Sequence, residues 1–211
     1  MADIKRKRKF YMNKNRIRLA VLAALMFGLC CAESEAQIVV AIMNNDVAEV
    51  RRLIAEGVDV NARSQSYNRD YRPTALMKAA ECDSVDVAKV LIAAGADVNA
   101  WDNHYGYTAL ICAAQKTYVL KADLKADYER NKSKNMAMVK LLIEAGANVN
   151  AKDGYGRTAL IYAVRKDSVD MAKLLIEAGA DVNVKDGYGK TALDYTYDSG
   201  LKELLRAAGA Q

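Results

Sequence analysis

LLIEAGANVNAKDGYGRTAL, residues 141–160, returns with few changes as LLIEAGADVNVKDGYGKTAL, residues 174–193. The offset between the two copies is 33 residues. A fixed period of this length indicates a repeat architecture, in which each unit buries its apolar face only against its neighbours. This stretch therefore decides the fold class before any single residue is considered.

Shorter copies of the stretch run through the rest of the chain. Its glycine-containing half appears as LIAEGVDVNA at 53–62, as LIAAGADVNA at 91–100 and, degraded, as LLRAAGAQ at 204–211. The phrase Thr-Ala-Leu begins at Thr74, Thr108, Thr158 and Thr191, at intervals of 34, 50 and 33 residues. The long interval predicts one period plus an insertion, residues 117–133, between the two helices of one unit.

Each unit is predicted to form two helices and a turn. In the fourth unit, Thr158 is placed to cap the first helix and Ser168 to cap the second. Gly179 is predicted to end the second helix, because the left-handed C-cap conformation costs least for glycine. The polar, glycine-rich stretch 180–190 then predicts a tight hairpin, whose aspartates serve its hydrogen bonds.

These phrases resemble ankyrin repeats. The 33-residue period, T-x-L-x-x-A-A, L-I-x-x-G-A-D-V-N-A and the D-x-x-G-x-T linker recur in one register over about residues 37–211. The resemblance implies an all-α solenoid of stacked helix-turn-helix units joined by β-hairpin-like turns. About five repeats are expected: 37–65, 66–103, 104–153, 154–186 and a C-terminal cap at 187–211. The family's T-P-L-H is here Thr-Ala-Leu followed by Met77, Ile111, Ile161 or Asp194, so its Thr–His hydrogen bond is unavailable.

The insertion 117–133 carries Leu120, Leu124 and Tyr128 at a spacing of four residues, which is helical spacing. The pattern predicts an extended first helix in the third repeat, followed by a flexible return through 131–135. The insertion is either a protruding partner contact or a tolerated surface insertion, and the sequence favours neither.

Residues 1–36 have a different character from the repeats. Basic residues extend to Arg18, an apolar run of 14 residues follows at 19–32, and Ser34-Glu35-Ala36 offers small residues for a signal peptidase. This order predicts a cleaved secretory signal and a secreted or periplasmic protein. A retained membrane anchor is a less favoured alternative, and so is a lipoprotein acylated at Cys30 or Cys31. A start at Met12 would give a more ordinary leader than a start at Met1.

The charge of the chain belongs to this leader. The chain has 31 basic and 26 acidic residues, of which residues 1–36 hold 8 and 3, which leaves 23 of each sign in 37–211. The basicity therefore does not argue for a nucleic-acid partner. A membrane contact is expected only through an uncleaved N-terminal segment, and the repeat domain is expected to be a monomer.

No catalytic, cofactor or metal site is predicted. His104 is the only histidine, which excludes histidine-based triads and sites with several histidines, and it falls at a hairpin tip. The DGYG stretches at Asp153 and Asp186 lack the lysine of a phosphate loop and the aspartate series of a calcium loop. Cys82 and Cys112 are expected to be free thiols rather than a disulfide.

Recognition of another protein is the function that the resemblance implies, through the hairpin tips and the concave face. Trp101, Tyr105 and Tyr107 are favoured as contacts, whereas the recurring Tyr155 and Tyr188 are favoured as packing residues. Tyr, Trp and Arg are typical of binding hot spots. The candidate contacts are Tyr67, Arg69, Tyr71, Arg72, Trp101, Asn103, His104, Tyr105, Tyr107, Lys152, Tyr155, Arg157, Lys185, Tyr188 and Lys190.

The partner is a protein that the sequence does not identify. Three roles are consistent with this reading: a secreted or periplasmic binding module, an envelope or stress-protection factor that escorts or inhibits an extracytoplasmic enzyme, and an effector directed at a host cell.

Overall fold

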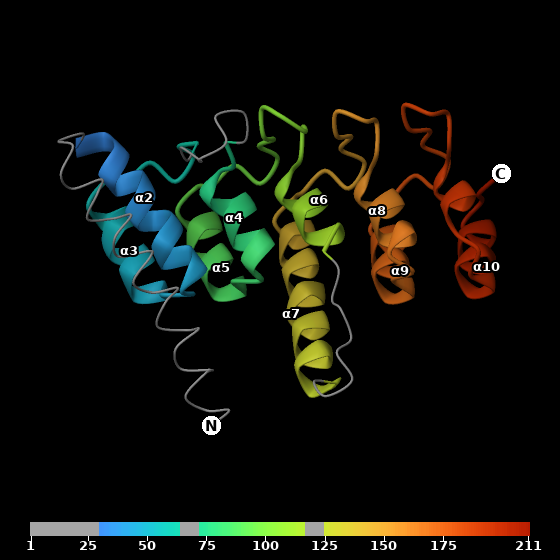
Figure 1. Cartoon of the computed structure of the whole chain (residues 1–211), viewed down its shortest axis with the longest axis horizontal. Helices are drawn as coiled ribbons and strands as arrows, with labels where there is room; N and C mark the ends of the chain where they lie inside the picture. Colours follow the sequence, from blue (N-terminus) through green and yellow to red (C-terminus); the bar gives the residue numbers. More distant parts are fainter. Residues whose placement is uncertain (1–29, 64–71, 117–124) are drawn as a thin grey trace, which may run out of the picture.

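A computed structural model of the chain describes residues 30–63, 72–116 and 125–211 (Figure 1). The helices stand side by side in an elongated row, and hairpins project from one edge of it. This is the all-α solenoid that the repeats predict. The helices are α2 (Cys30–Met43), α3 (Val47–Ala55), α4 (Ala75–Cys82), α5 (Val85–Ala93), α6 (Ala109–Ala114), α7 (Lys125–Glu144), α8 (Ala159–Arg165), α9 (Val169–Glu177), the 3₁₀ helix η1 (Ala192–Tyr195) and α10 (Ser199–Ala207).

The helices form two layers. The first helices of successive repeats, α2, α4, α6, α8 and η1, contact one another in turn, and the second helices α3, α5 and α7 do the same behind them. Small side chains make this close stacking possible: Ala79, Ala113 and Ala163 are fully buried at the equivalent position of three first helices. The interior is therefore one elongated core shared by neighbouring repeats.

Threonine caps begin the first helices as predicted. The hydroxyls of Thr74, Thr108 and Thr158 accept hydrogen bonds from the backbone N–H three residues later, at 3.4, 3.3 and 3.5 Å. The residues that replace the family's histidine, Met77, Ile111 and Ile161, are each about 1% exposed and pack in the core. The lost Thr–His hydrogen bond is thus replaced by apolar burial.

Ser168 stands at the N-cap of α9, but the prediction that its side chain caps the helix is wrong. Its backbone ψ is 83°, whereas ψ of the capping Thr158 is 169°. The hydroxyl of Ser168 therefore does not reach the first turn as the threonines do. At the other end of α9, Gly179 has the expected left-handed conformation, with φ +89°.

The helix that the insertion lengthens is the second helix of the third repeat, so the prediction of an extended first helix is wrong. The first helix α6 ends at Ala114, and α7 already contains residues 131–135, which were expected to form a flexible return. Lys, Ala, Glu and Arg in this segment have high helix propensity, which outweighs its polarity. Asn135 also anchors the helix, because its Nδ2 donates to Ala113 O at 3.1 Å and to Asp83 Oδ1 at 3.2 Å.

The leader is only partly described. Residues 1–29 lie outside the described ranges, and the predicted cleavage position after Ala36 falls inside α2. Of the helices that the structure describes, none is long and apolar enough to cross a membrane. The candidate contacts Tyr67, Arg69 and Tyr71 and the residues Leu120 and Leu124 also lie outside the described ranges.

Four asparagines join each repeat to the next. In each, the side-chain Nδ2 donates to the carbonyl of the glycine that ends the next repeat's second helix, at 3.0–3.1 Å. The Oδ1 of the same amide accepts a backbone N–H two residues after that glycine, at 2.7–3.0 Å. One side chain therefore satisfies two backbone groups that the helix end leaves open. The four are Asn61, Asn99, Asn150 and Asn183, paired with Gly95, Gly146, Gly179 and Gly209.

We expect Asn150→Ala to lower the free energy of unfolding by about 1–2 kcal/mol, because it removes two hydrogen bonds between the third and fourth units of the stack. Chemical denaturation followed by circular dichroism measures this. Asn103→Ala is the matched control: it lies exposed at a hairpin tip and should change stability by less than about 0.5 kcal/mol. Equal effects of the two variants would contradict the bridging role.

Candidate protein-interaction surface

Three of the hairpins that project from the stack, at 101–107, 153–157 and 186–190, are each built on a buried aspartate. Asp102 is 0% exposed, and Asp153 and Asp186 are each 6% exposed. The carboxylate of Asp102 accepts backbone N–H groups of His104, Tyr105 and Tyr107 at 2.8, 2.7 and 2.6 Å. The turn therefore folds around a single carboxylate, as the sequence predicts for these aspartates.

The next two hairpins repeat this geometry. Asp153 Oδ1 accepts the N–H groups of Tyr155 and Arg157, both at 2.8 Å. Asp186 Oδ1 accepts those of Tyr188 and Lys190 at 2.9 and 3.1 Å. The backbone positions of these hairpin side chains are thus fixed from inside.

Two tyrosines that the sequence analysis did not single out complete these hairpins. The hydroxyl of Tyr162 donates to Asp153 Oδ2 at 2.6 Å, and that of Tyr195 donates to Asp186 Oδ2. Both stand four residues after the capping threonine of their repeat, where earlier repeats have Lys78 and Cys112. That change of residue type is the signal that could have found them.

The pKa values of these groups reflect the contacts. Burial and the hydrogen bond to Asp153 raise the pKa of Tyr162, and the hydrogen bond to Asp186 raises the pKa of Tyr195. Burial opposes ionisation of Asp186, but hydrogen bonds from Tyr195 and from the backbone hold its pKa below the usual range. Asp186 is therefore an anion beneath its hairpin at neutral pH.

Neighbouring hairpins touch through their backbones. Gly154 N donates to Tyr105 O at 2.7 Å, and Gly187 N donates to Tyr155 O at 2.8 Å. A Cβ atom on Gly187 would lie 3.1 Å from Tyr155 O, closer than real Cβ atoms usually approach. Glycine suits this close approach, because a side chain would require the neighbouring hairpin to shift by a few tenths of an ångström.

The candidate contacts fall into three groups. Arg72, Trp101, Asn103, His104, Lys152, Tyr155, Lys185, Tyr188 and Lys190 are exposed; Tyr105, Tyr107 and Arg157 are half-buried; Tyr67, Arg69 and Tyr71 lie outside the described residues. The structure brings the described members together along the hairpin edge, except for Arg72 in the linker before α4.

The exposure of the aromatic residues differs from the sequence-based expectation. Tyr155 and Tyr188, expected to pack, are 44% and 70% exposed. Tyr105 and Tyr107 stack on each other with ring centroids 5.1 Å apart, and Tyr107 meets Tyr162 edge-on at 6.1 Å. Tyr105 and Tyr107 thus contact neighbouring rings and are half-buried, whereas Tyr155 and Tyr188 are more open to solvent.

Trp101 is exposed as expected, at 57%. The Arg63 guanidinium lies 5.6 Å from the centre of its ring, and Arg63 Nη1 donates to Trp101 O at 2.7 Å. These contacts fix the backbone of Trp101 while its ring stays open to solvent.

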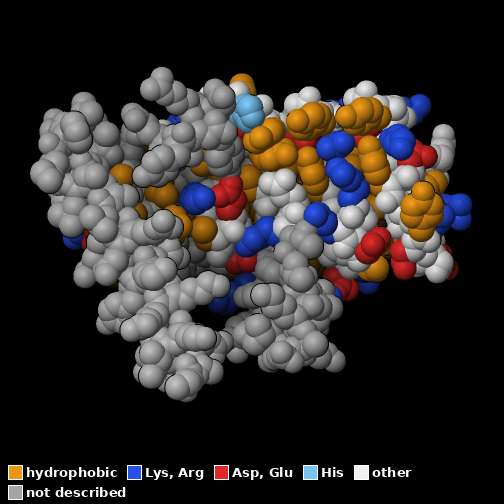
Figure 2. Space-filling view, in the orientation of Figure 1, with side chains coloured by type: hydrophobic (Ala, Val, Ile, Leu, Met, Phe, Trp, Pro, Cys, Tyr) orange, Lys and Arg blue, Asp and Glu red, His pale blue; other side chains and the backbone are white. Residues whose placement is uncertain are grey.

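One cationic side chain lies over the exposed rings of both of the last two hairpins. The Arg157 guanidinium is 5.1 Å from the ring centre of Tyr155 and 5.7 Å from that of Tyr188, and its Nε is 3.6 Å from Asp186 Oδ2. Its side chain is only 15% exposed, so Arg157 joins the two hairpins rather than standing free. Figure 2 shows Lys and Arg side chains directly beside the hydrophobic side chains along this edge.

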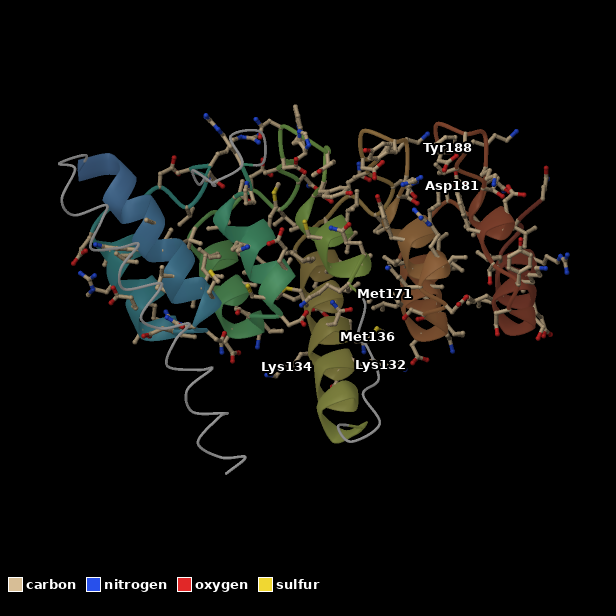
Figure 3. All side chains as sticks on the ribbon, in the orientation of Figure 1. Lys132, Lys134, Met136, Met171, Asp181 and Tyr188 are labelled. Carbon is tan, nitrogen blue, oxygen red and sulfur yellow. The ribbon has the colours of Figure 1, made fainter. Side chains whose placement is uncertain are left out.

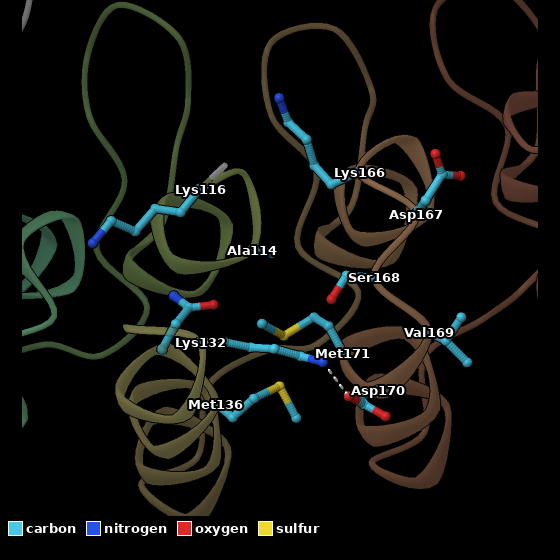
Figure 4. A pocket seen from close by; sticks show the side chains of 11 residues that line it. Ala114, Lys116, Lys132, Met136, Lys166, Asp167, Ser168, Val169, Asp170 and Met171 are labelled. Atoms are coloured by element: carbon cyan, nitrogen blue, oxygen red, sulfur yellow. Dashed lines mark ion pairs between the residues drawn. The ribbon is translucent and has the colours of Figure 1, made fainter. Parts of the chain in front are cut away.

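A cavity of about 210 Å³ opens at the other end of the helices, between α6–α7 and α8–α9 (Figure 4). It is lined in part by Met136 and Met171 and is crossed by an ion pair between Lys132 Nζ and Asp170 Oδ2 at 2.7 Å. Figure 3 shows these residues at the edge of the stack opposite Tyr188. The cavity is thus separate from the hairpin surface.

Side chains suited to catalysis or metal binding do not converge in residues 30–63, 72–116 and 125–211. Within these ranges, no group of three His, Cys, Asp or Glu residues could hold a metal ion. Cys82 and Cys112 are free thiols; Cys82 is exposed, whereas Cys112 is buried and burial raises its pKa. His104 is exposed at its hairpin tip, as predicted.

We expect the fold to lose stability in acid through Asp186. The pKa of Asp186 is lower in the folded chain than in the unfolded chain, where it is about 3.9. Its carboxylate therefore stabilises the fold at a pH above the unfolded pKa, and this stabilisation is lost as the pH falls through the folded pKa. Asp186→Asn should therefore lower the denaturation midpoint at pH 7 and flatten its decline below about pH 4. Denaturation midpoints measured across pH test this. The exposed Asp167→Asn should follow the wild-type profile, and a wild-type profile for Asp186→Asn would contradict the assignment.

Comparison with known proteins agrees with this architecture. Family models for ankyrin repeats match the chain twice: a model of three copies at residues 38–135 and a model of many copies at residues 142–195. The chain is 31% identical over 153 residues to the mitochondrial disaggregase of Bos taurus, covering 63% of this chain and 21% of that protein. It is 30% identical over 131 residues to FPV034, described as an ankyrin repeat protein, of fowlpox virus (strain NVSL), covering 62% of this chain and 25% of that protein.

The chain thus spans a quarter or less of the length of these two relatives, 21% and 25%. The recurring phrases, the two-layered stack and the two family models agree, and the chain belongs to the ankyrin-repeat family.

Proposed function

We propose that this chain is a non-catalytic module that binds another protein through its hairpin tips and the adjoining face of the first helices. Ankyrin repeats are protein-interaction modules, and stacked repeats present extended concave surfaces. The observation that carries the proposal is the row of exposed aromatic side chains on successive hairpins: Trp101 at 57%, Tyr155 at 44% and Tyr188 at 70% exposure. Aromatic side chains of this kind are typical of binding hot spots.

The rigidity of this row supports a binding role. Each hairpin backbone is held by a buried aspartate, and Gly187 N joins the hairpin of Tyr188 to that of Tyr155. Binding to a surface that is already ordered costs less conformational entropy than binding to a loop that must be fixed. The rings of Tyr155 and Tyr188 are therefore presented in a set arrangement.

We further propose that the protein acts outside the cytoplasm, in the secreted or periplasmic space. The support is the order of basic residues up to Arg18, the apolar run 19–32 and the small residues at Ser34 and Ala36. Two narrower roles fit such a location: an envelope factor that escorts or inhibits an extracytoplasmic enzyme, and an effector delivered to a host cell. Cell fractionation separates them, since an effector is recovered from the host cell and an envelope factor from the producing cell.

Mass spectrometry of the mature N-terminus tests the location directly. We expect the protein recovered from cells to begin at Gln37, because cleavage after Ala36 removes the whole apolar run. Recovery of a chain that retains residues 19–32 would refute the cleaved signal and favour a membrane anchor.

Affinity capture with the full-length chain tests the binding surface. We expect the variant Trp101→Ala/Tyr188→Ala to lose the proteins that the wild type enriches, with recovery reduced by about tenfold or more, since losing a hot-spot residue costs about 2 kcal/mol or more. Its circular dichroism spectrum should stay that of the wild type, because both rings are largely exposed.

Tyr197→Ala is the matched control for this capture. Tyr197 is 95% exposed and lies outside the hairpins, so its removal should leave recovery unchanged. Undiminished recovery with the double variant would overturn the hairpin surface as the binding site, and unfolding of that variant would place Trp101 or Tyr188 in the structural framework instead.

A further inference from the structure

We infer that the surface formed by Tyr155, Arg157, Arg165, Tyr188, Lys190 and Tyr195 binds an acidic segment of the partner protein. We name this set the cationic aromatic surface. The inference rests on the proposed function, which it deepens by giving the chemistry of the partner.

The two hairpin carboxylates of this region face inward. Asp153 and Asp186 are each 6% exposed. Each accepts two backbone N–H groups of its own hairpin and the hydroxyl of a tyrosine beneath it, Tyr162 or Tyr195. A partner that approaches the hairpins therefore does not meet these anions.

Two cations of the same region face outward, whereas Arg157 is half-buried beside Asp186. Arg165 and Lys190 are exposed, and neither forms an ion pair within the described residues. Arg165 lies 6.0 Å from the ring centre of Tyr162 and 5.3 Å from that of Tyr195, and Lys190 Nζ lies 5.5 Å from the Tyr195 ring. A cation on a ring face keeps donors free at its outer side, where carboxylates form charge-assisted hydrogen bonds.

The exposed carboxylate beside these cations is Asp194, and it is held in place by its own capping box. Its Oδ2 accepts the backbone N–H of Thr191 at 2.7 Å and the threonine hydroxyl at 3.0 Å. These bonds tie the carboxylate to the start of η1, where it attracts Lys190 but forms an ion pair with neither Lys190 nor Arg165.

The charge balance favours an acidic protein segment over a nucleic acid. Residues 37–211 carry 23 basic and 23 acidic residues, so the repeat domain lacks the net positive charge on which binding to a phosphate backbone depends. A local group of cations in a neutral domain instead suits short-range pairing with a few carboxylates, which fixes register and specificity. The exposed rings of Tyr155 and Tyr188 add apolar contact for the methylene groups of glutamate side chains.

Fluorescence anisotropy with a labelled polyglutamate peptide and the full-length chain tests the inference. We expect polyglutamate to bind and polylysine of the same length not to bind. The variant Arg165→Glu/Lys190→Glu should weaken the binding by about tenfold or more, because it replaces attraction with like-charge repulsion. The neutral variant Arg165→Gln/Lys190→Gln should weaken it less, and it keeps the test valid if charge reversal prevents folding.

The control variant Lys89→Glu/Lys173→Glu makes the same charge change on α5 and α9, where both side chains are well exposed, at 59% and 66%. It should bind polyglutamate as the wild type does. If this control lost as much affinity for polyglutamate as the Arg165 and Lys190 variant, the peptide would be attracted by the net charge of the protein, and the inference would be overturned.

Two further outcomes would also overturn it: no binding of polyglutamate, or tighter binding of a single-stranded oligothymidylate that the Arg165 and Lys190 variants abolish. Neither outcome touches the protein-binding proposal, which fails only if the Trp101 and Tyr188 variants leave protein capture unchanged.

Discussion

The side-chain amides of four asparagines fix how each repeat sits on the next. An ankyrin unit of this length cannot bury its apolar face alone, so its stability depends on the neighbouring unit. Each of Asn61, Asn99, Asn150 and Asn183 spans that boundary with one donated and one accepted hydrogen bond to the backbone at the end of the next second helix. Because the partners are backbone groups, the contact fixes register without restricting the exposed side chains.

Register at the helix ends carries over to the adjoining hairpins at the same edge of the stack, which meet backbone to backbone. Gly154 and Gly187 permit that approach, and the buried carboxylates of Asp153 and Asp186 organise each turn from within. This arrangement buries the anions and leaves aromatic and cationic side chains outside. The charge of this surface is thus a consequence of how the turns are stabilised. Because the turns bury their carboxylates, the neutral repeat domain has an edge that is locally cationic and aromatic.

Residues that repeat in register were predictable from the sequence, and residues that occur once were not. The period, the threonine caps and the terminal Gly179 follow from spacing and local backbone preference, which recur in every unit. The helix of the insertion was assigned to the wrong side, because the buried contact of Asn135 with Asp83 joins residues far apart in the chain. Tyr162 was missed for another reason: its partner Asp153 lies in the recurring motif, but the tyrosine stands where earlier repeats have Lys78 and Cys112.

Hydrogen–deuterium exchange of the full-length chain, free and bound to its captured partner, tests most directly the claim that this edge of the stack is the binding site. The account predicts that the partner slows exchange in the hairpins at 101–107, 153–157 and 186–190 and at the C-terminal end of α8, and leaves the second helices α3, α5 and α9 unchanged. Slowed exchange confined to the second helices, with the hairpins unaffected, would contradict it.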